Sequence, residues 1–261
     1  MQSIGAFSIV FWRFLIASIA LAIMTVYSKG RLNFGLIKGN LKELLILSVF
    51  LAFHFIFFAL AVADTTILNA TVLVNTVPIF SVFVSVFIFK LKPSRFALIG
   101  LAASFFGVCI IAYAETNVAV FGLHQANYVS TMKGDLEALF AAAVEAIYLT
   151  YGKKLRNKMN LLSIILPIYV LASVVVVILR IPVGARVFAL PTRVDETLAM
   201  VGLGMLPTAI AHTLFFSSLS NLKSFETATM ALLEPVGPLF WELAYFEKCQ
   251  RQYLLSEPPS L

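Results

Sequence analysis

Charged side chains inside apolar runs are the first candidates for chemistry in this sequence. Glu145 lies in FAAAVEAIYLTYG at 140–152, and Arg13 lies in VFWRFLI at 10–16. A charge at the centre of a bilayer costs about 2.5 to 3.5 kcal/mol, so such a residue is a functional candidate by default. We interpret Glu145 as a proton or cation carrier, with a structural hydrogen bond as the alternative. Arg13 is a counter-ion for Glu145, a ligand for an anionic solute group, or a side chain that reaches towards the interface.

Two histidines occupy matching places in the chain. His54 begins HFIFFAL and His212 begins HTLFFSS, and each precedes a phenylalanine pair. One interpretation is that both are packed core residues, because a lone histidine on an apolar helix usually is. The other is direct solute contact or proton relay. Tyr148, one helical turn after Glu145, is expected to shape an aromatic pocket beside them.

Asn69, Thr71 and Asn75 lie on one face of a predicted helix that ends one turn before Pro78. Such polar groups can hold a zwitterionic solute, or they can join helices by hydrogen bonds that contribute under about 1 kcal/mol each. Both interpretations stay open here.

Two prolines follow the histidines at nearly the same distance. Pro78 comes 24 residues after His54, and Pro235 comes 23 residues after His212. A proline leaves the carbonyl four residues earlier without its helical partner. In lipid such a carbonyl is tolerated only beside protein or a water-filled cavity. We therefore predict that both kinks line a cavity bordered by Glu234, with simple helix bending as the alternative.

The elements that must position these residues are membrane-spanning helices. Of 261 residues, 61% are hydrophobic and 12% are charged, whereas a globular domain has about 25% charged residues. The apolar runs are unbroken and long enough to cross a bilayer as helices, which excludes a transmembrane barrel. The fold class is therefore an all-α polytopic bundle. Its eight predicted spans are residues 4–28, 44–63, 65–89, 96–114, 136–152, 161–179, 197–222 and 227–246.

Basic residues orient the bundle. Twelve Lys and Arg residues lie in the connections on one side, against six on the other side and in the C-terminal tail. By the positive-inside rule the first set is cytoplasmic. The net charge of +6 is thus a topology signal, and no nucleic acid partner is predicted. The cytoplasmic connections are residues 29–42, 90–95, 153–160 and 220–224.

The chain repeats itself at an offset of about 157 residues, as the paired histidines and prolines indicate. Five spans separate equivalent elements, so the two copies must be inverted in the membrane, as in many transporters. By this offset the sequence holds spans two to nine of a five-plus-five arrangement and lacks the first and last helices. A true eight-helix protein, a fragment and a misread frame are equally compatible with this.

A small-residue face follows the basic turn near residue 95. Gly100, Ser104 and Gly107 recur at helical spacing, which permits close contact between helices. We predict an architectural packing role for them.

The segments TTILNATVLVNTVPIF, GDLEALFAAAVEAIYLTYGKKL and TATMALLEPVGPLF resemble the EamA repeats of the drug/metabolite transporter superfamily. The resemblance covers most of residues 7–240. It implies a first repeat at 1–115 with spans two to five, a second at 134–247 with spans six to nine, and a polar tail at 248–261. It also implies alternating access around a central cavity and movement of small organic solutes.

Enzyme motifs are lacking: there is no G-x-S-x-G elbow, no H-E-x-x-H and no phosphate loop. No catalytic residue, metal site or cofactor is therefore predicted. We expect a plasma-membrane secondary transporter for amino acids or similar metabolites, with the solute and the lipid bilayer as partners. Proton or cation coupling and a homodimer are left open. The alternatives are a membrane-embedded enzyme and a truncated remnant that does not transport.

Overall fold

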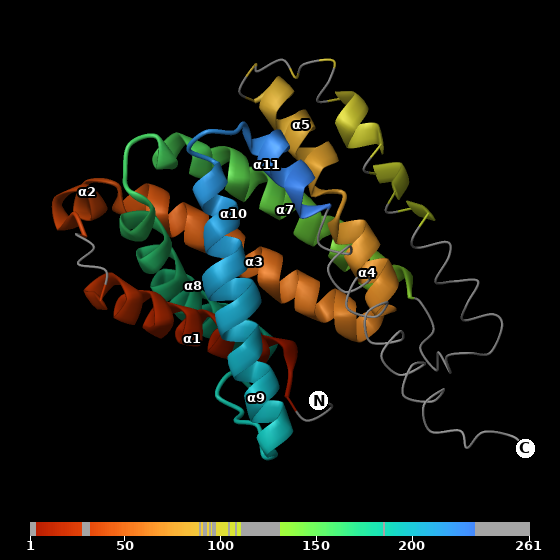
Figure 1. Ribbon diagram of the computed structural model, residues 1–261. Helices are drawn as coiled ribbons and strands as arrows, with labels where there is room; N and C mark the ends of the chain where they lie inside the picture. Colours follow the sequence, from red (N-terminus) through yellow and green to blue (C-terminus); the bar gives the residue numbers. More distant parts are fainter. Residues whose placement is uncertain are drawn as a thin grey trace, which may run out of the picture.

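The computed structural model describes residues 4–27, 32–88, 131–184 and 186–232, together with scattered residues between 90 and 110. Every regular element in these ranges is helical, which confirms the predicted all-α fold (Figure 1). Ser104, Glu234, Pro235 and the predicted tail at 248–261 lie outside the described residues. Their predicted roles therefore stay predictions.

The first half of the chain forms five described helices. They are α1 (Ala6–Tyr27), α2 (Phe34–Gly39), α3 (Leu41–Asp64), α4 (Ile67–Val74) and α5 (Val77–Phe87). The chain turns between α3 and α4, where Thr65 is extended and the Thr66 side chain accepts a hydrogen bond from the Asn69 backbone N–H. The predicted span at 65–89 forms two short helices, α4 and α5, which are separated at Asn75 and Thr76. Pro78 lies in the first turn of α5, where its missing N–H would have had no helical partner.

The second half is built from longer pieces. They are α7 (Met132–Arg156), α8 (Leu161–Val183), α9 (Val194–Leu203), the π-helix η1 (Gly204–His212), α10 (Thr213–Ser218) and α11 (Ser224–Ala231). Side chains cap two of them: Thr131 accepts from the Gly134 N–H, and Asn160 accepts from the Ser163 N–H. The helices α9, η1 and α10 follow each other without a break and form one long rod in Figure 1.

Five helical segments among the described residues are long and apolar enough to cross a membrane. They are Ala6–Tyr27, Leu41–Asp64, Asn69–Phe87, Leu161–Val183 and Val194–Ser218. Each overlaps a span predicted from the sequence. The predicted span at 136–152 lies within α7, whose ends carry acidic and basic residues.

Many large apolar side chains face outwards along these segments. Ile19, Ile23, Ile178, Leu198 and Leu214 are each at least half exposed. A water-soluble protein seldom exposes contiguous apolar surface on this scale. The outer face therefore suits a lipid environment.

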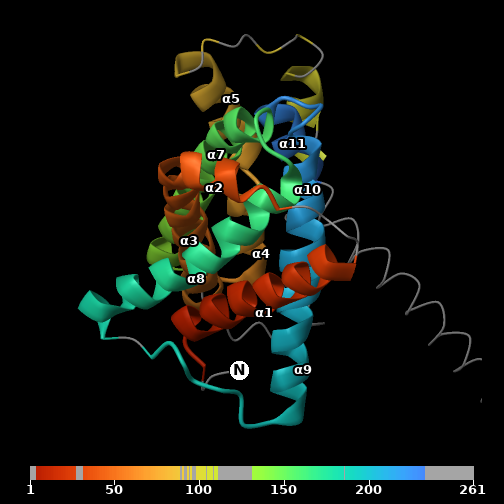
Figure 2. The same cartoon turned by 90° about the vertical axis from the view of Figure 1, so that its left-hand side faces the viewer.

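The core lies where α3 packs against α7 and α8, and where α1 crosses α8 and η1. Figures 1 and 2 show α3 among these helices, with the α9–η1–α10 rod on one side. The largest fully buried side chains include Phe14, Tyr148, Tyr169 and Phe216. Aromatic rings from both halves of the chain thus fill the centre of the bundle.

Candidate functional site

Polar side chains from five helices meet inside this aromatic core. We call them the central cluster: Arg13 on α1, His54 on α3, Glu145 and Tyr148 on α7, Tyr169 on α8, and Thr208 and His212 on η1. All but Arg13 are buried, and Arg13 is half-buried. Five of the seven were predicted from the sequence, and the structure brings those five together.

His54 and Glu145 form the acidic side of the cluster. His54 Nδ1 lies 3.1 Å from the Ala141 carbonyl oxygen and 3.5 Å from Glu145 Oε2. A carbonyl can only accept, so Nδ1 carries the hydrogen and donates it to Ala141. The Glu145 carboxyl, 8% exposed as a residue, is thus held beside an imidazole N–H and away from lipid.

Arg13 faces the interior of the bundle. Its Nε donates to Thr208 Oγ1 at 3.1 Å, and its guanidinium lies 4.6 Å above the centre of the Phe55 ring. A cation over an aromatic face is stabilised by the ring quadrupole, more strongly when water is excluded. Arg13 therefore joins α1 to α3 and η1 at the depth of the cluster.

His212 lies against Tyr148, Tyr169 and Phe55. Its Nδ1 is 3.2 Å from Tyr169 Oη, and its ring centre is 5.7 Å from that of Tyr148. The Phe55 ring is 5.6 Å from His212 and 5.1 Å from His54. The two histidines at matching places in the sequence therefore contact the same phenylalanine.

The π-helix and a glycine bring η1 close to α1. A Cβ added to Gly204 would lie 2.7 Å from Ile16 Cβ, so only glycine allows this approach. π-helical turns are rare and often occur at functional sites. Here η1 places Thr208 opposite Arg13 and His212 opposite Tyr148.

Tyr169 and Thr208 were missed by the sequence analysis. Tyr169 stands 156 positions after Arg13 (169 − 13), close to the repeat offset, and this spacing is the signal that could have revealed it. An aromatic residue in an apolar run is ordinary core composition, so its type alone gives no indication. Thr208 follows Pro207 inside an apolar segment, and its residue type likewise gives no indication of a role.

The predicted asparagine face lies on α4 and at its C-terminal end. Asn69 is on α4, and Asn75 is the residue that ends α4, which packs against α7. Asn75 is 3% exposed, and its Nδ2 has no hydrogen-bond partner among the described residues. Its amide is therefore available to a bound molecule or a water.

The small-residue face stays a prediction. A Cβ added to Gly100 or Gly107 would meet no atom within 4 Å. Close approach is instead required at Gly152, where an added Cβ would lie 2.6 Å from Phe216, and at Gly134, where it would lie 2.7 Å from the Asp64 backbone.

Lysines hold both ends of α7. At one end Lys133 Nζ lies 2.6 Å from Asp64 Oδ2, and this hydrogen bond raises the Lys133 pKa. At the other end Lys153 Nζ donates to the Leu219 and Leu222 carbonyls at 2.9 and 2.6 Å, and burial lowers its pKa. Leu222 follows Asp64 by 158 positions (222 − 64), the same offset that separates the two histidines (212 − 54).

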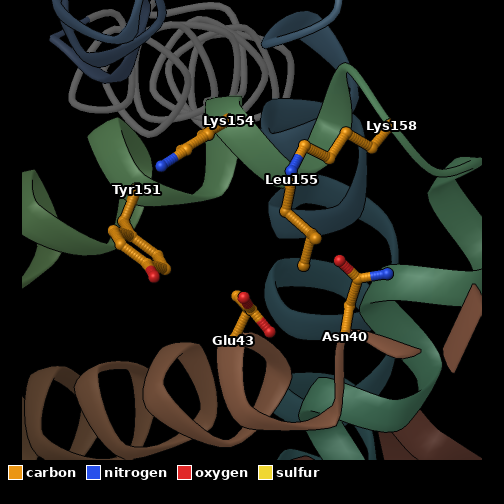
Figure 3. Close-up of a pocket in the computed structure, with 6 residues that line it drawn as sticks. All are labelled: Asn40, Glu43, Tyr151, Lys154, Leu155 and Lys158. Atoms are coloured by element: carbon orange, nitrogen blue, oxygen red, sulfur yellow. The ribbon is translucent and has the colours of Figure 1, made fainter. Parts of the chain in front are cut away.

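A separate polar pocket of about 50 Å³ lies where α3 begins and α7 ends (Figure 3). It is lined by Asn40, Glu43, Tyr151, Lys154, Leu155 and Lys158. Glu43 is 11 residues before His54 on α3, about 16 Å along the helix axis. The pocket is therefore distinct from the central cluster and lies at the predicted cytoplasmic end.

The outward apolar faces and the buried polar cluster define a multi-pass integral membrane protein. Residues 1–113 and 132–249 both match the model of the EamA-like transporter family. The chain belongs to this family, and hence to the drug/metabolite transporter superfamily, as the resemblance predicted. As a transporter of this family it resides in the plasma membrane.

Individual proteins agree with this assignment. The chain is similar to the uncharacterized transporter YdfC of Bacillus subtilis, with 27% identity over 226 residues, covering 85% of this chain and 67% of the relative. An uncharacterized transporter of Archaeoglobus fulgidus is 26% identical over 265 residues, covering 99% and 83%. A solved crystal structure matches the fold with a TM-score of 0.72 at 15% identity, covering 93% of this chain and 80% of that one.

Proposed function

We propose that this protein is a secondary transporter that moves small organic solutes, such as amino acids, by alternating access. In this proposal the solute binds at the central cluster, and Glu145 couples its movement to a proton. Membership of a transporter family supports the coarse function. The central cluster supports the choice of site, because ionisable groups at membrane depth mark substrate and ion pathways.

The observation that carries the coupling role is the contact between Glu145 and His54. Glu145 Oε2 lies 3.5 Å from His54 Nδ1 within an apolar bundle. Since Nδ1 already carries a hydrogen, a further proton that enters this pair binds either the carboxylate or His54 Nε2. Either event adds one positive charge beside Arg13 and His212, so protonation and solute binding are coupled by charge.

The matching histidines support alternating access. His54 and His212 come from the two halves of the sequence and contact one phenylalanine. Such a central site can open to either side if the halves rock against each other. The lysine contacts at the two ends of α7 would then have to break in turn.

Proton-driven uptake tests the role of Glu145. Purified protein in proteoliposomes is given a pH gradient and a mixture of radiolabelled amino acids. We expect Glu145→Gln to abolish uptake against the concentration gradient of the solute. Exchange of solute across the membrane in the absence of a pH gradient should persist. The matched control is Glu43→Gln on α3, which lies in the separate pocket and should accumulate solute normally. Full accumulation by Glu145→Gln would remove the coupling role, and no uptake by the unmodified protein would count against the proposed substrates.

A further inference from the structure

We propose that Tyr148 Oη and His212 Nε2 form a subsite for a neutral solute group that both donates and accepts a hydrogen bond, a hydroxyl in the simplest case. Tyr169 is the positioning residue that sets the polarity of this subsite. The inference rests on the proposed transport function and specifies one part of the solute.

The subsite is defined by two polar atoms that lack partners. Among the described residues, Tyr148 Oη and His212 Nε2 are buried and make no hydrogen bond. Tyr148 is fully buried, and His212 is 9% exposed. Buried polar atoms in native proteins are almost always satisfied, by protein, water or ligand. The two ring centres lie 5.7 Å apart, so the two side chains are direct neighbours.

The tautomer of His212 follows from the hydrogen bonds of Tyr169. Tyr169 Oη donates its only hydrogen to the Thr208 carbonyl at 2.9 Å. The same oxygen lies 3.2 Å from His212 Nδ1, so in that contact it must accept and Nδ1 must donate. In a neutral imidazole the other nitrogen then has no hydrogen. His212 Nε2 therefore presents a lone pair.

The position of Thr208 is fixed by further bonds. Its Oγ1 accepts from Arg13 Nε at 3.1 Å and donates to the Leu203 carbonyl at 2.8 Å. The Thr208 carbonyl is thus held in place for Tyr169. The hydrogen bonds of the protein itself therefore determine which groups of Tyr169 and His212 donate and which accept, without any bound solute.

The subsite consequently needs a donor for His212 Nε2 and an acceptor for the Tyr148 hydroxyl. A carboxylate only accepts and would leave the His212 Nε2 lone pair without a donor, and an ammonium group only donates and would leave the Tyr148 hydroxyl hydrogen without an acceptor. A hydroxyl does both. A site built this way rejects an analogue without the hydroxyl, because its buried groups are then unpaired.

Nitrogen NMR tests the tautomer without any solute. The protein is labelled with ¹⁵N-histidine in lipid nanodiscs, and His212 is assigned by comparison with His212→Gln. The couplings of each ring nitrogen to Hδ2 and Hε1 identify the protonated one. We expect hydrogen on Nδ1, and in Tyr169→Phe a shift of hydrogen towards Nε2. The matched control Tyr151→Phe, on α7 outside the central cluster, should leave the spectrum unchanged. Hydrogen on Nε2 in the unmodified protein, or an unchanged Tyr169→Phe spectrum, would overturn the role of Tyr169.

Solute pairs that differ by one hydroxyl test the subsite. Serine is compared with alanine, and glycerol with propanediol, by their effect on the His212 Nε2 resonance and by competition for uptake. We expect the hydroxylated member of at least one pair to shift the resonance and to compete about 10-fold better or more. Tyr148→Phe should reduce this preference to about twofold, and Tyr151→Phe should keep it.

The outcomes separate this inference from the proposed function. If neither pair shifts the resonance, the solute subsite is rejected. If the resonance shifts but no solute is taken up, the subsite stands and the transport function fails.

Discussion

At the residue scale, the central cluster depends on contacts that only glycine permits. Gly204 allows Ile16 of α1 to touch η1, and this contact places Arg13 within hydrogen-bonding distance of Thr208. Gly202, two residues earlier, has no atom within 4 Å of an added Cβ. The two glycines therefore form a matched pair in which only one is constrained by packing.

We expect Gly204→Ala to lower the free energy of unfolding by about 1–3 kcal/mol, because the new methyl group overlaps a rigid Cβ of Ile16. Gly202→Ala should be neutral or slightly stabilising, since alanine loses less backbone entropy in a helix. Thermal unfolding of the detergent-solubilised protein measures both. Equal melting temperatures for the two variants would show that α1 and η1 separate at little cost.

Residue types explain which parts of the site the sequence could predict. Glu145, Arg13 and the two histidines stand out because a charge or imidazole is rare in an apolar run. Tyr169 and Thr208 do not, because their roles come from hydrogen bonds that only the folded chain creates. The proton positions on Tyr169 and His212 could not be predicted for the same reason, because they too depend on hydrogen bonds in the folded chain.

At the element scale, α7 is the helix that connects the two halves. It packs against α3, α4, α5 and α11, and a lysine holds each of its ends. Lys133 contacts Asp64 at the end of α3, and Lys153 contacts the carbonyls that follow α10. These two helix ends are separated in the sequence by the repeat offset. In the proposed alternating access, release of one of these contacts at a time would open one end of the bundle.

The contact of Lys153 can be tested against its neighbour. Lys153→Met removes the donor for the Leu219 and Leu222 carbonyls, and we expect a loss of about 1 kcal/mol in the free energy of unfolding. Lys154→Met is the control, because Lys154 is exposed and should change stability by under about 0.5 kcal/mol. Chemical unfolding curves in detergent compare the two. A smaller loss for Lys153→Met than for Lys154→Met would contradict the contact.

The elements could be predicted from the sequence to different extents. Long apolar runs predict helices, and α1, α3 and α8 each overlap an expected span, although α3 and α8 extend beyond its bounds. The break between α4 and α5 comes near Pro78, as its restricted backbone suggests, although the helix ends at Val74. The π-helix η1 could not be predicted, because Gly204 acts there through its close approach to Ile16 of α1.

At the scale of the whole molecule, the proposed alternating access requires the two repeats to be inverted in the membrane. It predicts that equivalent loops face opposite sides of the membrane. Lys38, in the connection at 29–42, should be cytoplasmic, and Arg193, 155 positions later (193 − 38) in the equivalent connection before α9, should be external. Both side chains are exposed, so both positions can be labelled.

Single cysteines at Lys38 and Arg193 test this in intact cells, after Cys109 and Cys249 are replaced by serine. A thiol reagent that cannot cross the membrane should label Arg193→Cys in intact cells and Lys38→Cys only after the cells are opened. Ile178→Cys serves as the control, because Ile178 is 58% exposed on an apolar face of α8 and a lipid-facing thiol resists aqueous reagents. Labelling of both loop positions from the same side would rule out the inverted arrangement, and a central site reached in turn from each face would then lose its structural basis.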